Sequence, residues 1–140
     1  MILLKNFFVD ATKGLDLLKI VHEVRRVVKE GNTENGSVTI VIPNPGAGLA
    51  VLDINDRPED LKKTLEPHVA SGLVKVMLPK SLTIPFEKFK MLIEPWQEIF
   101  LIDYDTSGRR REFKVQVEAE TPPPAAGKKG PMGPGGPPRG

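Results

Sequence analysis

The feature that most constrains the fold is a pair of strand-like segments near the C-terminal end, residues 97–104 and 112–119. The first is apolar at successive positions, which is typical of a strand covered on both faces. The second alternates strictly between apolar and polar side chains, as a half-solvated antiparallel strand does. Turn-forming residues lie between them, namely Asp105, Thr106, Ser107 and Gly108. We therefore predict a long antiparallel β-hairpin.

Two helices are expected earlier in the chain. Apolar residues recur at helical spacing across residues 17–28, with charged residues on the other face, and Gly31 follows as a stop signal. Asp16 is a candidate cap for this helix. A shorter helix is expected from residue 58 to about residue 65, because proline suits the first turn and acidic residues suit the helix dipole. Pro67 is expected to end it.

Several short apolar runs predict further strands. They cover residues 2–9, 37–42, 49–54, 73–78 and 82–86. Strands outnumber helices and short links join neighbouring strands. The sequence therefore predicts an α+β fold of mainly antiparallel, sandwich-like sheets with one long and one short helix.

Composition divides the chain into one domain, residues 1–120, and a tail, residues 121–140. The tail consists mostly of proline and glycine and is expected to be disordered, because it cannot build a core. Its glycines at 127, 130, 133 and 136 keep a three-residue period. A collagen-like association of three tails is the less favoured interpretation of that period.

Composition also limits the classes of function. The chain has no cysteine, which excludes disulfides and fits the reducing cytoplasm. No apolar run approaches the roughly 20 residues that span a bilayer, and no cleavable leader is evident, so we expect a cytoplasmic protein without membrane contact. The net charge of +2 is too small to indicate a nucleic-acid partner.

The second half of the chain carries an ordered set of motifs, with Ser81, Ile84 and Pro85, then Trp96, Gln97, Ile99 and Leu101, then Arg109 to Arg111, and finally Val115, Gln116 and Val117. In this order the motifs resemble the YjbQ-like family of secondary thiamine-phosphate synthases. Upstream, residues 12–15 and 35–38 extend the resemblance, so that it covers about residues 5–120. The resemblance implies a YjbQ-like fold, a homotrimer, and transfer of a pyrimidine diphosphate to a thiazole phosphate.

The histidines of the family pattern are missing from this chain. Asn44 stands where the first histidine would be, and the second position falls near Gly72 and Leu73. Asparagine is a poor ligand for zinc, and glycine and leucine offer no donor. We therefore expect no metal site of the family kind. The carboxylates of Asp53 and Asp56 leave magnesium as a possible cofactor, although Asp56 also suits a helix cap.

The resemblance and the local patterns together indicate candidate ligand-binding residues. They are Asn44, Gly46, Asp53, Trp96, Gln97, Arg109 and Arg111. Arginines of such a cluster can bind phosphate or carboxylate, but they also form solvated edges that discourage sheet aggregation. The loop at 43–48 can equally be an ordinary connection, and Trp96 can anchor a core or a subunit contact. His22 and His68 lie outside any metal-binding motif.

Three functions therefore remain open for the sequence. The favoured one is a catalytically impaired YjbQ-like protein that binds a small anionic or phosphorylated molecule. The second is a weak thiamine-phosphate-synthase-like transferase, in which arginines and aspartates with magnesium neutralise the leaving pyrophosphate. The third is a non-catalytic trimeric scaffold. Catalytic residues are not assigned.

Overall fold

A computed structural model describes residues 1–11, 14–53, 55, 57–105 and 110–119. The strands are β1 (Ile2–Asp10), β2 (Asp16–Lys19), β3 (Gly36–Val41), β4 (Ala47–Asp53), β5 (Ser81–Glu87), β6 (Lys90–Met91), β7 (Gln97–Asp103) and β8 (Arg110–Ala119). The helices are α1 (Val21–Glu30), α2 (Pro58–Ala70) and α3 (Leu73–Met77). The tail predicted at 121–140 and the turn residues Thr106, Ser107 and Gly108 lie outside the described residues.

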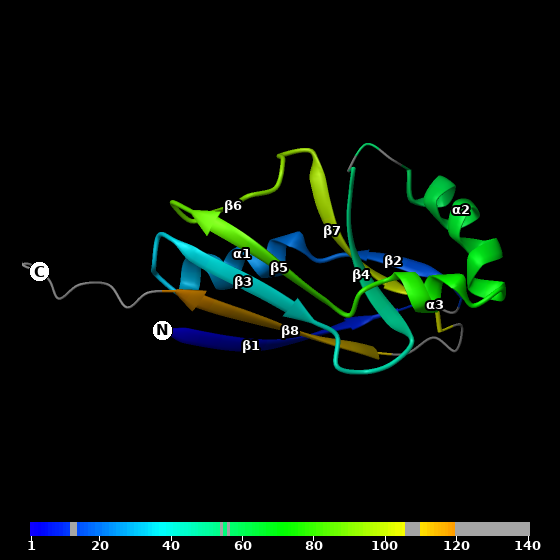
Figure 1. Ribbon diagram of the computed structural model, residues 1–140, viewed down its shortest axis with the longest axis horizontal. Helices are drawn as coiled ribbons and strands as arrows, with labels where there is room; N and C mark the ends of the chain where they lie inside the picture. The colour runs from blue at the N-terminus through cyan, green and yellow to red at the C-terminus, as the bar shows by residue number, and fades with distance from the viewer. Residues whose placement is uncertain (12–13, 54, 56, 106–109, 120–140) are drawn as a thin grey trace, which may run out of the picture.

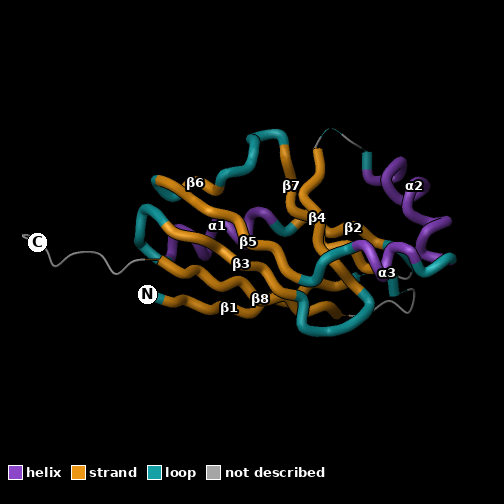
Figure 2. The backbone as a smooth tube through the Cα atoms, viewed as in Figure 1, coloured by secondary structure: helices purple, strands orange, loops and turns teal. Residues whose placement is uncertain are grey.

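The strands form two sheets in which every pairing is antiparallel. The large sheet has the order β1-β8-β3-β5-β6 and the small sheet the order β2-β7-β4. In Figure 1 the large sheet runs along the length of the molecule, with α1 behind it, and α2 and α3 lie beside the small sheet. Figure 2 shows the same arrangement by element type. The predicted α+β fold with mainly antiparallel sheets is confirmed.

One core joins the large sheet, α1 and the small sheet. Inward side chains of β8, β3 and β5 pack against Val24, Val27 and Val28 of α1 and against Leu49, Ile99 and Leu101 of the small sheet. The strict alternation of β8 explains this packing, because alternate side chains of a strand point to one face. A smaller cluster on the opposite face of the small sheet holds Leu17, Phe100 and Ile102 against Leu61 and Leu65 of α2. The small sheet is therefore covered on both faces.

The predicted hairpin is wrong, because β7 and β8 belong to different sheets. β7 is the central strand of the small sheet, between β2 and β4, and all but its first residue are buried. β8 lies between β1 and β3 in the large sheet. The physical reason lies in the two burial patterns: a strand that is apolar on both faces needs cover on both sides, whereas β8 presents one face to solvent. The chain therefore crosses from one sheet to the other.

The start of α1 also differs from the prediction. Asp16 and Leu17 belong to β2, and the helix begins at Val21 after Ile20, which makes no side-chain cap. Glu98 of β7 takes the capping role, because its Oε2 accepts hydrogen bonds from the backbone N–H groups of Val21 and Ile99, each at 3.0 Å. A buried carboxylate satisfies both a free donor and the helix dipole there.

Two predictions in the middle of the chain are wrong. α2 continues past Pro67 to Ala70, because a proline in the last turns removes a single helical hydrogen bond and the helix ends only a few residues later. In the range 73–78, predicted as a strand, residues 73–77 form α3 after the left-handed Gly72. A short apolar run does not by itself distinguish strand from helix. No helix among the described residues is long and apolar enough to cross a membrane.

Candidate functional site

A network of buried polar contacts surrounds Arg111, near the start of β8. Its side chain is 1% exposed, and that of Asp103, the last residue of β7, is 0% exposed. The guanidinium donates from Nε to Asp103 Oδ2 at 3.0 Å and from Nη2 to Asp103 Oδ1 at 2.8 Å. This bidentate geometry is the strongest form of an arginine–carboxylate pair. It ties the large sheet to the small sheet.

Further contacts of Arg111 involve the loop that precedes β4. Nη1 donates to the carbonyl oxygen of Pro45 at 2.7 Å, and Nη2 donates to that of Gly46 at 3.3 Å. The carboxylate of Asp105 lies 3.3 Å from Nη2. The hydrogen bond to Asp103 raises the pKa of Arg111, and burial opposes that rise less strongly. Arg111 therefore remains charged, and the carboxylates of Asp103 and Asp105 both lie against it.

The glycine at position 46 is required by this packing. Gly46 has φ +98°, and a Cβ built on it would lie 2.6 Å from Arg111 Nη2 and 2.8 Å from Asp105 Cβ. Its carbonyl oxygen also accepts hydrogen bonds from the backbone N–H groups of Tyr104 and Asp105. Asn44, one step before Pro45, is exposed, and its carbonyl oxygen accepts a 2.6 Å hydrogen bond from Lys80 Nζ. The backbone carbonyl oxygens of this loop thus accept hydrogen bonds from Lys80, Arg111 and the residues that follow β7.

A second group of predicted residues lies at the other end of the β4–β7 pair. Asp53 is opposite Gln97 in the strand register, whereas Ala47, which follows the loop, is opposite Asp103. The six residue steps along β4 separate the two ends by about 20 Å. Trp96 is 51% exposed and adjoins the second end. Within a single chain, Asn44, Gly46 and Arg111 therefore lie toward one end of the β4–β7 pair. Asp53, Trp96 and Gln97 lie at the other end.

Side chains of the second group engage in local turns. Gln97 Oε1 accepts a hydrogen bond from the backbone N–H of Glu94 at 2.9 Å, and Asp53 Oδ1 accepts one from Asn55 at 3.0 Å. Arg109 and Asp56 lie outside the described residues, as does any site that would include them. Within the described ranges, no group of three or more histidine, aspartate or glutamate side chains is arranged to hold a metal ion.

Sequence reasoning missed the partners of Arg111. It selected the arginine but not Asp103, which contacts it across the two sheets. One signal was available: Arg111 has the same parity as Phe113, Val115 and Val117, so the alternation of β8 points it toward the core. A buried arginine needs a carboxylate, and Asp103 ends the other buried strand.

Comparison with solved structures identifies the class of fold. A YbjQ-like protein of unknown function from Sulfolobus solfataricus P2 superimposes with TM-score 0.75 at 18% identity, over 84% of this chain and 96% of that chain. A hypothetical protein from Aeropyrum pernix K1 gives TM-score 0.75 at 19% identity, over 84% and 98%. An uncharacterized conserved protein of the YjbQ/UPF0047 family from Clostridium acetobutylicum gives TM-score 0.70 at 17% identity, over 81% and 99%.

These similarities define an α+β fold of the YjbQ-like type. No protein-family profile matches the chain, and no curated protein matches it. The resemblance that the motifs indicated is confirmed at the level of the fold: this chain has the YjbQ-like fold.

Replacing Arg111 by alanine is expected to lower the free energy of unfolding by about 3–5 kcal/mol, because Asp103 would remain buried without its counterion. Urea denaturation followed by circular dichroism measures this change. The matched control is Arg110→Ala. Arg110 is exposed and lies 4.4 Å over the ring of Phe8, a contact worth about 1 kcal/mol or less. Equal effects of the two substitutions would contradict a structural role for Arg111.

Substitution of Gly46 by alanine is expected to be more destabilising than substitution of Gly72. Both glycines have positive φ, so each substitution carries a backbone cost of about 1–2 kcal/mol. A Cβ at Gly72 would meet nothing within 4 Å, whereas one at Gly46 would press on the held guanidinium of Arg111 and add about 1–3 kcal/mol. Urea midpoints of the two variants compare these costs. If the midpoints agree, the contact between loop and arginine is looser than described.

Proposed function

We propose that this protein is a divergent, catalytically impaired YjbQ-like protein that binds a small anionic or phosphorylated molecule. The observation that supports the loss of catalysis in this proposal is the set of contacts of Arg111. Its guanidinium, the strongest candidate for a phosphate contact, is occupied by Asp103, Asp105 and two loop carbonyls. An incoming pyrophosphate would have to displace carboxylates from a buried site, so this arginine is unsuited to stabilise a leaving group.

The sequence supports the same proposal. Asn44 stands where the family pattern has a histidine. Its side chain is exposed, and the hydrogen bond described above involves only its backbone carbonyl oxygen. In this proposal the chain keeps the fold of the family but has lost its turnover. A cysteine-free chain suits the reducing cytoplasm, where small phosphorylated metabolites are abundant. The remaining activity in this proposal is binding.

A panel of ligands tests the proposal by thermal unfolding. It contains inorganic phosphate, pyrophosphate, thiazole phosphate and pyrimidine diphosphate, each with and without Mg²⁺, with sulfate and the unphosphorylated thiazole as controls. We expect at least one phosphorylated ligand to raise the melting temperature, since a ligand that binds only the folded state stabilises it by mass action. We also expect no pyrophosphate release from the mixed substrates.

The alternative outcomes are distinct. Release of pyrophosphate from the mixture would replace this proposal by the weak transferase. Absence of any shift, with the protein well folded, would leave the scaffold as the function.

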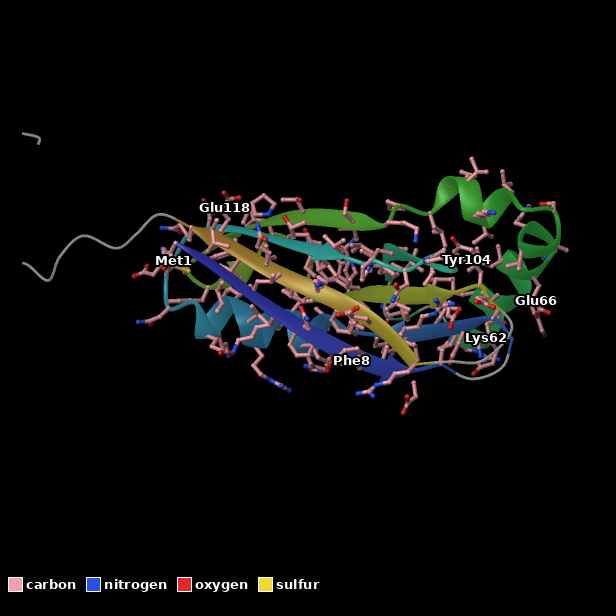
Figure 3. The ribbon with its side chains drawn as sticks, turned by 90° about the horizontal axis from the view of Figure 1, so that it is seen from below. Met1, Phe8, Lys62, Glu66, Tyr104 and Glu118 are labelled. Carbon is pink, nitrogen blue, oxygen red and sulfur yellow. The ribbon has the colours of Figure 1, made fainter. Side chains whose placement is uncertain are left out.

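A specific observation supports the scaffold as the second candidate, in the form of a homotrimer. β1 is an edge strand, and its outward side chains Ile2, Leu4 and Phe8 are 65%, 51% and 52% exposed. Figure 3 shows Phe8 on β1, at the border of the large sheet. Edge strands with apolar outward faces favour association with other chains. Assembly would also allow the two separated groups of predicted residues to meet across subunits.

Light scattering is expected to give three times the mass of one chain. The pair Leu4→Lys and Phe8→Lys should reduce the mass to that of a monomer, because buried lysines without partners oppose association. Val76→Lys is the matched control, since Val76 is an 80% exposed apolar side chain on α3. A monomer in the unsubstituted protein would remove both the trimer and any site shared between subunits.

A further inference from the structure

A concave site lies between α1 and the β5–β6 hairpin, and it includes none of the residues that the sequence motifs indicated. Its volume is about 400 Å³, and its lining includes the basic residues Arg25, Lys29 and Lys90 and the apolar residues Phe89, Met91 and Ile93. We call it the α1 cleft. In Figure 1, α1 lies behind the large sheet, of which β5 and β6 form one edge. The size falls within the range of small-molecule sites.

The charges at the α1 cleft are of one sign. Arg25 and Lys29 are separated by one helical turn on the exposed side of α1, an arrangement of like charges that disfavours an isolated helix. Among the described residues neither forms an ion pair, which is also true of other exposed cations such as Arg26 and Lys63; what distinguishes Arg25 and Lys29 is that both line one concave site. The C-terminal dipole of α1 accounts for Lys29 but not for Arg25, which lies mid-helix. A bound anion would compensate both charges.

The turn of the β5–β6 hairpin, beside these charges, has an unusual backbone conformation. Lys88 and Phe89 both have positive φ, 52° and 66°, in a two-residue turn where glycine or asparagine is the ordinary choice. The turn is held by two hydrogen bonds, from the backbone N–H of Phe89 to Glu34 O at 3.0 Å and from that of Lys88 to Asn35 Oδ1 at 3.2 Å. Backbone strain that is held in place by its surroundings is concentrated at ligand sites. Here it places Phe89 in the cleft lining.

We propose that the α1 cleft binds a small organic phosphate whose hydrocarbon or ring portion contacts Phe89 and Met91, with its phosphate at Arg25 and Lys29. Arginine is suited to bidentate recognition of phosphate, and lysine supplies a second charge. The apolar lining of Phe89, Met91 and Ile93 favours an organic phosphate over the inorganic ion, because burial of a hydrocarbon portion adds to the charge interaction. This inference rests on the proposed function and assigns it a location.

The test uses the full chain and phenyl phosphate as the probe, with titration followed by calorimetry and by amide chemical shifts. We expect saturable binding of phenyl phosphate that is tighter than that of inorganic phosphate, and no binding of benzyl alcohol. Arg25→Ala with Lys29→Ala should weaken binding about tenfold or more. Arg26→Ala with Lys63→Ala is the matched control: it removes the same charge from exposed positions outside the cleft and should leave the affinity unchanged.

A second pair of variants separates binding from folding. Phe89→Gly relieves the backbone strain and removes the ring, so the affinity for phenyl phosphate should fall while the amide shifts of α1 remain those of a folded helix. Lys88→Gly relieves the same strain at the neighbouring position and keeps the ring. It should bind as the unsubstituted protein does. Equal affinities for Phe89→Gly and Lys88→Gly would show that the ring does not contact the ligand.

The failures of this inference and of the proposed function can be distinguished. If phenyl phosphate does not saturate at millimolar concentration, or binds both charge variants equally, the α1 cleft is not the site. The function would still stand if the thiazole and pyrimidine phosphates stabilise the protein independently of Arg25 and Lys29. Conversely, pyrophosphate release together with cleft binding would overturn the impaired-catalysis proposal and leave the cleft in place.

Discussion

The buried pair of Arg111 and Asp103 is the interaction on which the rest of the structure depends. It joins the start of β8 in the large sheet to the end of β7 in the small sheet, and the carbonyl oxygens of Pro45 and Gly46 complete its shell. A charge removed from water is tolerated only when other groups satisfy its hydrogen bonds. The crossing between sheets, the loop before β4 and the position of β7 must therefore form together.

This arrangement gives Arg111 a structural role in place of the ligand-binding role that the resemblance implied. The arginine that would contact a phosphate in the interpretation from resemblance is here a structural cation, and the loop beside it presents carbonyl oxygens inward. A negative ligand is better placed where positive charges have no internal partner. Arg25 and Lys29 meet that condition in the described part of the chain. They lie on α1, whose first residue, Val21, donates its backbone N–H to Glu98. In our proposal Arg111 is therefore structural, whereas Arg25 and Lys29 are available to a ligand.

Much of the fold could be predicted because the buried face of a helix or strand appears in the sequence as a periodic pattern of apolar residues. The alternation of β8 and the helical period of α1 predicted their buried faces correctly, and the apolar run of β7 predicted cover on both sides. The pairing of β7 with β8 was wrong because periodicity reports which face is buried and not which strand lies alongside. The run at residues 73–78 was wrong because a short apolar segment fits either a strand or a helix.

The sequence by itself determined the YjbQ-like fold and the inward faces of β8 and α1. Only the tertiary structure decided that Arg111 is neutralised by Asp103, that the candidate residues fall into two groups, and that Arg25 and Phe89 line one cleft. The physical reason is the range of the interactions. Periodicity and turn chemistry act over a few residues, whereas charge compensation and strand pairing join positions as far apart as Pro45 and Arg111.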